Sequence, residues 1–263
     1  MMDRLAVALA QLNPHVGQVE KNLSGIVAAR AEAARQGADL VVTPELSIAG
    51  YPSDDLLSKR AFIEACRGAV ERLAQVTGDG GPGMVVGAPW AEDGMLYNAA
   101  LLLEGGSVAA KRFKHELPDY GVFDDKRHFT PGPAPGPIAF RGFRIGLMVC
   151  EDFWLPTVSE TLAESGAELL VAINGSPFEV DKQASRETQA VARVVETSLP
   201  FVFLNQVCGH DELVYDGASF VLNPDRSVAL RMAEFASDLR LTHWVRNSGG
   251  VSCEAQAIAP EMP

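Results

Sequence analysis

The chain has 263 residues, of which 47% are hydrophobic and 21% are charged, a composition typical of a globular protein rather than a disordered or collagen-like one. Its 22 Lys and Arg residues are outnumbered by 34 Asp and Glu residues, which gives a formal net charge of -12. That charge argues against a protein that binds nucleic acid or that attaches to a membrane through basic residues.

The cysteines and the amino-terminal segment favour the reducing cytoplasm as the compartment. Four cysteines are too few for a disulfide scaffold in a chain of this length, and the absence of a C-x-x-C pair argues against a thiolate zinc site. The apolar run at residues 5–12 is much shorter than the roughly 20 residues of a membrane-spanning helix, and it lacks the basic segment of a signal peptide. We therefore expect a cytoplasmic protein without a metal site or membrane contact.

Segments with the pattern of strands and helices alternate along the first half of the chain. The predicted strands are residues 4–12, 39–43, 84–89, 96–103 and 107–113, and the predicted helices are residues 19–36 and 60–77. Gly105-Gly106 predicts a tight hairpin turn between the last two of these strands. Residues 114–137 form a long irregular stretch rich in Pro and Gly, and a loop of that length in a compact domain is often functional.

The second half continues the alternation. The predicted strands are residues 143–149, 168–173, 201–207, 213–222 and 227–235, and helices are predicted after Pro156 and over residues 181–198. The last thirty residues are weakly patterned. Because no linker, composition shift or internal repeat divides the sequence, we predict a single α/β domain over residues 1–263 with mixed strands.

One motif match, a run of glycines, does not indicate a binding site. Gly78-Asp-Gly-Gly-Pro-Gly83 fits the spacing G-x-G-x-x-G, but it lies between a helix and a strand, whereas a dinucleotide site needs a strand before the glycines and a helix after them. The five histidines show no metal-ligand spacing. Of the cysteines, Cys66 and Cys208 read as packing residues, and Cys253 falls in the weakly patterned tail.

Three chemically useful side chains follow predicted strands directly. Glu45 follows residues 39–43 through Pro44, Lys114 ends residues 107–113, and Cys150 follows residues 143–149. Ligands of α/β sheets bind at the carboxyl ends of strands. A lysine beside a cysteine favours the thiolate, and a glutamate can move protons. Each residue taken alone also reads as a surface charge or a core thiol.

These three segments resemble the nitrilase (carbon–nitrogen hydrolase) superfamily. The matching catalytic motifs are Pro44-Glu-Leu-Ser-Ile-Ala-Gly-Tyr51, Lys114-His-Glu-Leu-Pro-Asp-Tyr120 and Cys150-Glu-Asp-Phe-Trp154. Within the superfamily the sequence is most similar to the glutaminase domain of glutamine-dependent NAD synthetases. That similarity rests on Leu117-Pro-Asp-Tyr-Gly-Val-Phe-Asp-Asp-Lys-Arg127, Asn174-Gly-Ser-Pro-Phe178 and Asn205-Gln-Val-Cys-Gly-His-Asp-Glu-Leu-Val-Tyr-Asp-Gly217.

The resemblance implies an α/β fold of four layers, an α-β-β-α sandwich with mixed sheets. It also implies a catalytic triad of Glu45, Lys114 and Cys150, in which the thiolate attacks the carboxamide of glutamine, the glutamate moves protons and the lysine stabilises the oxyanion. The residues implied to hold glutamine or to lie beside it are Tyr120, Ser176, Lys182, Glu151, Phe123 and Tyr51. For Tyr120 and Phe123, simple loop packing is the alternative interpretation.

The sequence departs from the family pattern in three places. Asp119 stands where members usually have Asn, and Asp125 stands where they have Glu, which keeps the charge on a side chain one methylene shorter. The S-G-G-x-D-S pyrophosphate loop of the synthetase domain has no counterpart, since Ser248-Gly-Gly250 lacks the aspartate. We therefore expect that the chain alone does not make NAD and that ATP, Mg²⁺ and deamido-NAD belong to a synthetase domain or partner.

The resemblance leaves three hypotheses open. The first is a glutamine amidohydrolase, needing no cofactor of its own, that supplies ammonia for NAD synthesis as an excised domain or a free-standing relative. The second is a stand-alone amidase that acts on another small amide. The third is a non-catalytic interaction module, against which the intact Glu45, Lys114 and Cys150 speak. Superfamily members usually pair, so we also expect a homo-oligomer.

Overall fold

The computed structural model describes residues 3–256, and two mixed β-sheets dominate it. The first sheet has the strand order β15-β14-β1-β2-β3-β4-β5. Its strands are β1 (Arg4–Gln11), β2 (Leu40–Val42), β3 (Gly83–Glu92), β4 (Met95–Glu104), β5 (Ser107–Phe113), β14 (Asp238–Asn247) and β15 (Gly250–Cys253). β1, β2 and β3 run parallel, and the other neighbours pair antiparallel.

The second sheet has the order β13-β12-β9-β8-β7-β6. Its strands are β6 (Ile138–Phe140), β7 (Phe143–Val149), β8 (Leu169–Asn174), β9 (Phe201–Asn205), β12 (Phe220–Leu222) and β13 (Val228–Arg231). Its centre, β7-β8-β9, is parallel, and these strands are almost entirely buried. Continuous apolar runs such as these are typical of parallel strands covered on both faces.

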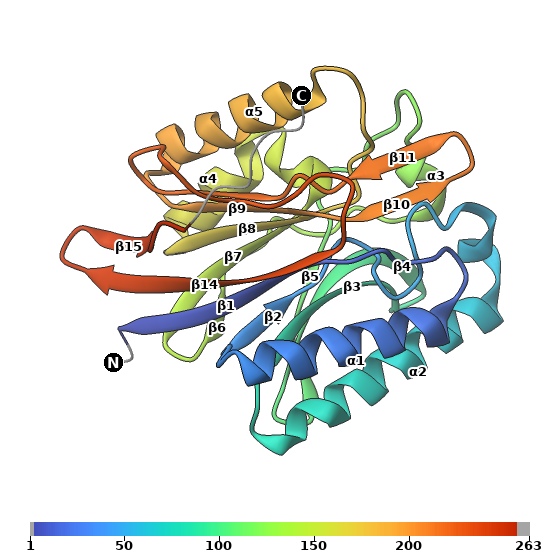
Figure 1. The fold of residues 1–263 in the computed structure, drawn as a ribbon. Helices are drawn as coiled ribbons and strands as arrows, with labels where there is room; N and C mark the ends of the chain where they lie inside the picture. Colours follow the sequence, from blue (N-terminus) through green and yellow to red (C-terminus); the bar gives the residue numbers. More distant parts are fainter. Residues whose placement is uncertain (1–2, 257–263) are drawn as a thin grey trace.

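Helices cover the outer face of each sheet. α1 (Val19–Arg35) and α2 (Arg60–Val76) lie on the first sheet, and α4 (Pro156–Glu164) and α5 (Lys182–Thr197) lie on the second (Figure 1). α2 packs on the sheet because one side of it is apolar. The residues of that side recur at helical spacing and are all buried against the sheet: Cys66, Ala69, Val70 and Leu73. Between the sheets lies a separate apolar layer built from β1, β2 and β7–β9. The predicted four-layer α-β-β-α sandwich is therefore confirmed.

The carboxyl-terminal part departs from the sequence prediction. The predicted strand 201–207 ends at Asn205, and the predicted strand 213–222 is split, because residues 207–216 fold back on themselves as a hairpin of β10 (Val207–His210) and β11 (Leu213–Asp216). Cys208 lies half-buried in β10 of that hairpin. The predicted strand 227–235 shortens to β13.

The weakly patterned tail is an integral part of the first sheet. β14 pairs with the whole of β1, from Arg4 opposite Val245 to Gln11 opposite Asp238. Its sequence places the exposed His243 between the buried Thr242 and Trp244 and puts Arg240 two positions before Thr242, which weakened the apolar signal. Cys253 is buried in β15. Within residues 3–256 no helix has the length and apolar character that crossing a membrane requires.

The two sheets bring particular strand ends together. In the second sheet Val149 pairs with Ile173, and Asn174 pairs with Asn205, so the residues after β7, β8 and β9 emerge at one edge. In the first sheet β3 and β4 lie between β2 and β5, and the segment that follows β2 comes close to the end of β5. The predicted long loop follows β5 and contains only the short helix α3 (Asp125–His128). This edge holds the site described next.

Candidate active site

Glu45 is completely buried and both of its carboxylate oxygens are occupied. Oε1 accepts hydrogen bonds from Asn98 Nδ2 at 2.7 Å and from Lys114 Nζ at 2.8 Å, and Oε2 accepts one from the backbone N–H of Gly175 at 2.8 Å. The segment that carries Glu45 passes close to β3 at Gly87, where a Cβ would lie 2.3 Å from the carbonyl oxygen of Pro44. Only glycine allows that approach, and it holds Glu45 against the end of β4.

Lys114 connects two carboxylates. Its Nζ lies 2.8 Å from Glu45 Oε1 and 2.5 Å from Asp125 Oδ2, and all three side chains are buried. Burial lowers the pKa of Lys114, but the charges of Glu45 and Asp125 outweigh it and raise that pKa well above the ordinary value. Lys114 is therefore an ammonium ion. Asp125, although shorter than the glutamate of the family pattern, reaches it from the first turn of α3.

Cys150 begins a short 3-10 turn, Cys150–Phe153, directly after β7, and is 2% exposed. Its φ of 47° lies in the left-handed region, which is rare for a residue with a side chain and is found at strained functional positions. Burial and the charge of Glu45 raise the pKa of the thiol well above the ordinary value, while Lys114 acts in the opposite direction. The lysine was expected to favour the thiolate. In this structure burial and Glu45 prevail, so the resting group is the neutral thiol.

Asp152 ties together the segments that carry Lys114 and Cys150. Its Oδ1 accepts the backbone N–H groups of His115 and Glu116, each at 2.9 Å, and its Oδ2 accepts that of Val149 at 2.9 Å. Burial raises the pKa of this carboxyl to about 6, although the three backbone hydrogen bonds act to lower it. One side chain therefore fixes the residues directly after the lysine and directly before the cysteine.

Glu151 and Tyr120 face each other beside Cys150. The Tyr120 hydroxyl donates to the Glu151 carboxylate, with O–O distances of 2.9 and 3.0 Å, and the Tyr120 and Phe123 rings contact edge to face at 5.6 Å. Tyr120 is 54% exposed. Burial raises the pKa of Glu151, and the tyrosine hydrogen bond partly offsets that effect. The long loop thus brings Tyr120 and Phe123 beside the residue that follows Cys150.

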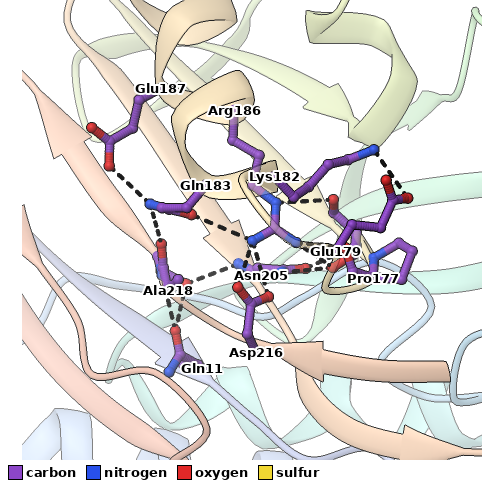
Figure 2. Close-up of polar contacts among 12 residues, drawn as sticks. Gln11, Pro177, Glu179, Lys182, Gln183, Arg186, Glu187, Asn205, Asp216 and Ala218 are labelled. Carbon is purple, nitrogen blue, oxygen red and sulfur yellow. Dashed lines mark hydrogen bonds and ion pairs between the residues drawn. The ribbon is translucent and has the colours of Figure 1, made fainter. Parts of the chain in front are cut away.

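The remaining predicted residues lie around the same edge. Tyr51 is buried, its hydroxyl is 3.4 Å from Asp125 Oδ1, and its ring packs so closely on Gly175 that a Cβ there would lie 2.7 Å away. Ser176 is buried directly after Gly175. Lys182 begins α5 and pairs with Glu179 at 3.4 Å (Figure 2). Its Nζ lies 5.4 Å above the ring of Trp154.

Three residues of the cluster were not singled out from the sequence: Asn98, Asp152 and the backbone of Gly175. Asn98 is a polar residue inside the apolar strand β4, and that contrast was a usable signal. Asp152 lies within a quoted motif without an assigned role. The N–H of Gly175 has no side-chain signature at all. Among residues 3–256 no group of three or more His, Cys, Asp or Glu side chains is arranged to hold a metal ion.

Comparison with known proteins places this site in a family. Residues 6–247 match the family described as Carbon-nitrogen hydrolase. The chain belongs to the carbon–nitrogen hydrolases. Its structure is similar to that of a glutamate-to-glutamine mutant of the amidase from Nesterenkonia sp. AN1, with a TM-score of 0.80, 27% identity and coverage of 90% of this chain and 92% of that one. In that amidase acrylamide has added at the active site cysteine.

Longer proteins are also similar to this chain. It is 43% identical over 89% of its length to the glutamine-dependent NAD(+) synthetase of Rhodobacter capsulatus, and it covers 42% of that protein. The glutamine-dependent NAD+ synthetase from Acinetobacter baumannii superimposes with a TM-score of 0.92 and 33% identity, over 99% of this chain and 49% of the other. The carbon–nitrogen hydrolase described here therefore spans about half the length of these synthetases.

Proposed function

We propose that the protein hydrolyses the side-chain amide of L-glutamine and releases ammonia, with Cys150 as nucleophile, Glu45 as general base and acid, and Lys114 as the oxyanion-stabilising cation. The observation that carries the proposal is the position of Glu45. Its carboxylate is fixed by three donors and is also the largest charge effect on the Cys150 thiol. A buried thiol needs an adjacent proton acceptor to become a nucleophile.

The reaction then follows in two balanced halves. The Cys150 sulfur bonds to the carboxamide carbon while its proton passes to Glu45, and the resulting oxyanion is stabilised by Lys114 and the backbone N–H of Glu151, a donor of this type being worth about 3 kcal/mol. Glu45 returns the proton to the nitrogen, and the C–N bond breaks to give ammonia and a thioester. Water, losing a proton to Glu45, cleaves the thioester to glutamate and the free thiol.

The surrounding residues suit an amino-acid amide. Glu151 offers a carboxylate to the α-ammonium of glutamine, and Ser176 and Lys182 offer a hydroxyl and an ammonium to its α-carboxylate. Because Cys150 is 2% exposed, we infer that the loop carrying Tyr120 and Phe123 moves when the substrate enters. The length of the similar synthetases supports a role in which the ammonia amidates deamido-NAD in a synthetase domain or partner that binds ATP and Mg²⁺.

Ammonia release from a panel of amides tests the proposal. We expect kcat/KM for L-glutamine to exceed that for acetamide, propanamide and L-asparagine by at least about 100-fold, and Cys150→Ala to abolish turnover of all of them. A higher kcat/KM for a plain amide would instead support the stand-alone amidase, which the similarity to the Nesterenkonia amidase makes the second candidate. Full turnover by the Cys150→Ala variant would exclude both.

A further inference from the structure

Arg186 has no exposed surface, and its guanidinium is fully engaged beside the site (Figure 2). Nη1 binds both oxygens of Asp216 at 2.8 and 2.9 Å, and Nη2 donates to the carbonyl oxygens of Ser176 at 2.9 Å and Pro177 at 2.8 Å. The remaining N–H, on Nε, donates to Ser176 Oγ at 3.1 Å. Arg186 therefore holds the loop that follows β8 through hydrogen bonds to Ser176 and Pro177.

A second residue holds the backbone of the same serine. Asn205 Oδ1 accepts the N–H of Ser176 at 2.9 Å, and Asn205 Nδ2 donates to its carbonyl oxygen at 3.0 Å. Asn205 is itself held, because its N–H donates to Ser219 Oγ at 2.9 Å and that hydroxyl donates to Gln11 Oε1 at 2.7 Å. The backbone of Ser176 is thus saturated, and its hydroxyl is the group left to act on a ligand.

The contact with Arg186 decides which way that hydroxyl works. A guanidinium has donors only, so Ser176 Oγ must be the acceptor in this hydrogen bond. The hydroxyl hydrogen is then directed elsewhere, and among residues 3–256 no acceptor receives it. A buried donor without a partner costs about 1–3 kcal/mol. A substrate atom that meets this hydroxyl is therefore a hydrogen-bond acceptor.

We propose that Arg186 is a positioning residue for substrate selection, which orients the Ser176 hydroxyl as a donor to the α-carboxylate of the substrate. The proposal rests on the proposed function and names its selectivity: an amide that carries a carboxylate is preferred over an amide of the same length without one. Asp216 serves this arrangement by neutralising the buried guanidinium, and its hairpin is bound to the loop through the N–H of Phe178 and the carbonyl oxygen of Val214 at 2.7 Å.

Two substrates that differ by one group separate this role from simple loop stability. L-Glutamine carries the α-carboxylate, and 4-aminobutanamide has the same amide, chain and ammonium without it. The variant is Arg186→Gln with Asp216→Asn, which leaves no unpaired charge and offers an amide oxygen to the serine hydroxyl. We expect kcat/KM for glutamine to fall about 10- to 100-fold, mainly through KM. We expect kcat/KM for 4-aminobutanamide to change less than about threefold.

A matched control exists in another buried arginine. Arg30 pairs with Asp79 through both terminal nitrogens and donates from Nε to the carbonyl oxygen of Pro82 at 2.8 Å, and it makes no contact with the site residues. Arg30→Gln with Asp79→Asn is expected to change neither kcat/KM. An equal loss on both substrates in the Arg186 variant, or no loss on either, would overturn the proposal, because each means that Arg186 does not act on the carboxylate.

The proposal can also be tested without altering Arg186, should the double variant fail to fold. The wild-type protein is compared on 4-carbamoylbutanoate, which keeps the carboxylate and lacks the ammonium, and on 4-aminobutanamide, and Ser176→Ala is compared on the same pair. We expect Ser176→Ala to lose activity on the first substrate only. Equal losses would refute the donor role of the hydroxyl. Absence of turnover of glutamine by the wild-type protein would instead refute the proposed function.

Discussion

Asn98 donates its side-chain amide to Glu45 Oε1 at 2.7 Å, on the same oxygen that receives Lys114 Nζ. Its backbone carbonyl oxygen accepts the backbone N–H of Lys114 at 2.8 Å. One residue of β4 thus positions both the carboxylate and the lysine of the candidate triad. Because β4 pairs with β3 along its whole length and with β5 from Ala99 to Glu104, this arrangement follows from the register of the first sheet.

Replacing Asn98 by Leu is expected to lower kcat for ammonia release about 10- to 100-fold with little change in KM. A hydrogen bond to a charged group is worth about 1.5–3 kcal/mol, and the loss falls on the proton-transferring carboxylate, not on the substrate. Steady-state kinetics with glutamine measures it. Asn223→Leu, which removes a side-chain amide bound to β15 outside the site, is the control. A rise in KM without a fall in kcat would contradict this role of Asn98.

Replacing Lys114 by Met is expected to abolish ammonia release and to reduce the free energy of unfolding by about 3–5 kcal/mol. The change leaves Glu45 and Asp125 buried close together without their shared cation, and removing one partner of a buried ion pair is costly for that reason. Urea denaturation at neutral pH measures the loss. Lys111→Met breaks the half-buried pair with Glu92 and should cost no more than about 1 kcal/mol. Equal losses in the two variants would argue against a buried charge cluster.

Asp152 predicts a specific pH dependence of stability. Its pKa in the folded protein is raised to about 6 by burial, above the value of an unfolded aspartate. The sign is therefore that its contribution to stability is complete at pH values below the unfolded pKa and is lost as the pH rises through about 6. Relative to Asp152→Asn, which does not titrate, the wild-type protein should lose about 1 kcal/mol between roughly pH 5.3 and 7.5.

Urea denaturation of both proteins across that pH range measures this difference. If the difference between wild type and Asp152→Asn stayed constant, Asp152 would not bind a proton more tightly in the folded state. The result would then contradict the raised pKa.

Glu45→Gln is expected to lower the pKa of the Cys150 thiol, which favours the thiolate, and yet to lower the rate of ammonia release. Burial raises the pKa of the thiol most, the charge of Glu45 raises it further and Lys114 lowers it, so removing the charge of Glu45 makes the pKa fall. Ammonia release nevertheless falls about 100- to 10,000-fold, because the proton acceptor is lost. The ultraviolet absorbance of the thiolate, measured against pH with the Glu45→Gln/Cys150→Ala variant subtracted, gives the midpoint. A midpoint at or above that of the wild-type protein would refute the electrostatic link.

The sequence was sufficient to predict the parallel strands and the covering helices. Their patterns are strong, as in the continuous apolar run of β8 and the apolar residues at helical spacing in α2. β14 could not be predicted, since it lies at a half-exposed position and mixes arginines with apolar residues. The hairpin at residues 207–216 was missed for a different reason. Its boundary depends on Asn205 and Gln206 turning inward to polar contacts, which no apolar period encodes.

The same division holds at the site. Glu45, Lys114 and Cys150 could be picked out because each follows a strand, and the family resemblance pairs them. The buried carboxylate of Glu45 accepts hydrogen bonds from three donors, and its charge helps to keep the Cys150 thiol neutral. Both features depend on distances that come from the packing of the two sheets. Arg186 and Asp216 are thirty positions apart and meet only because the end of β11 lies next to the first turns of α5. No spacing rule brings such a pair together.

The most direct test of the account is mass spectrometry of the protein after reaction with a diazo-ketone analogue of glutamine. The account predicts one covalent adduct, located on Cys150 by peptide mapping, blocked by excess glutamine and absent from Cys150→Ala. An adduct on Cys66, Cys208 or Cys253 instead, or labelling that glutamine does not slow, would contradict the claim that Cys150 attacks the amide of glutamine.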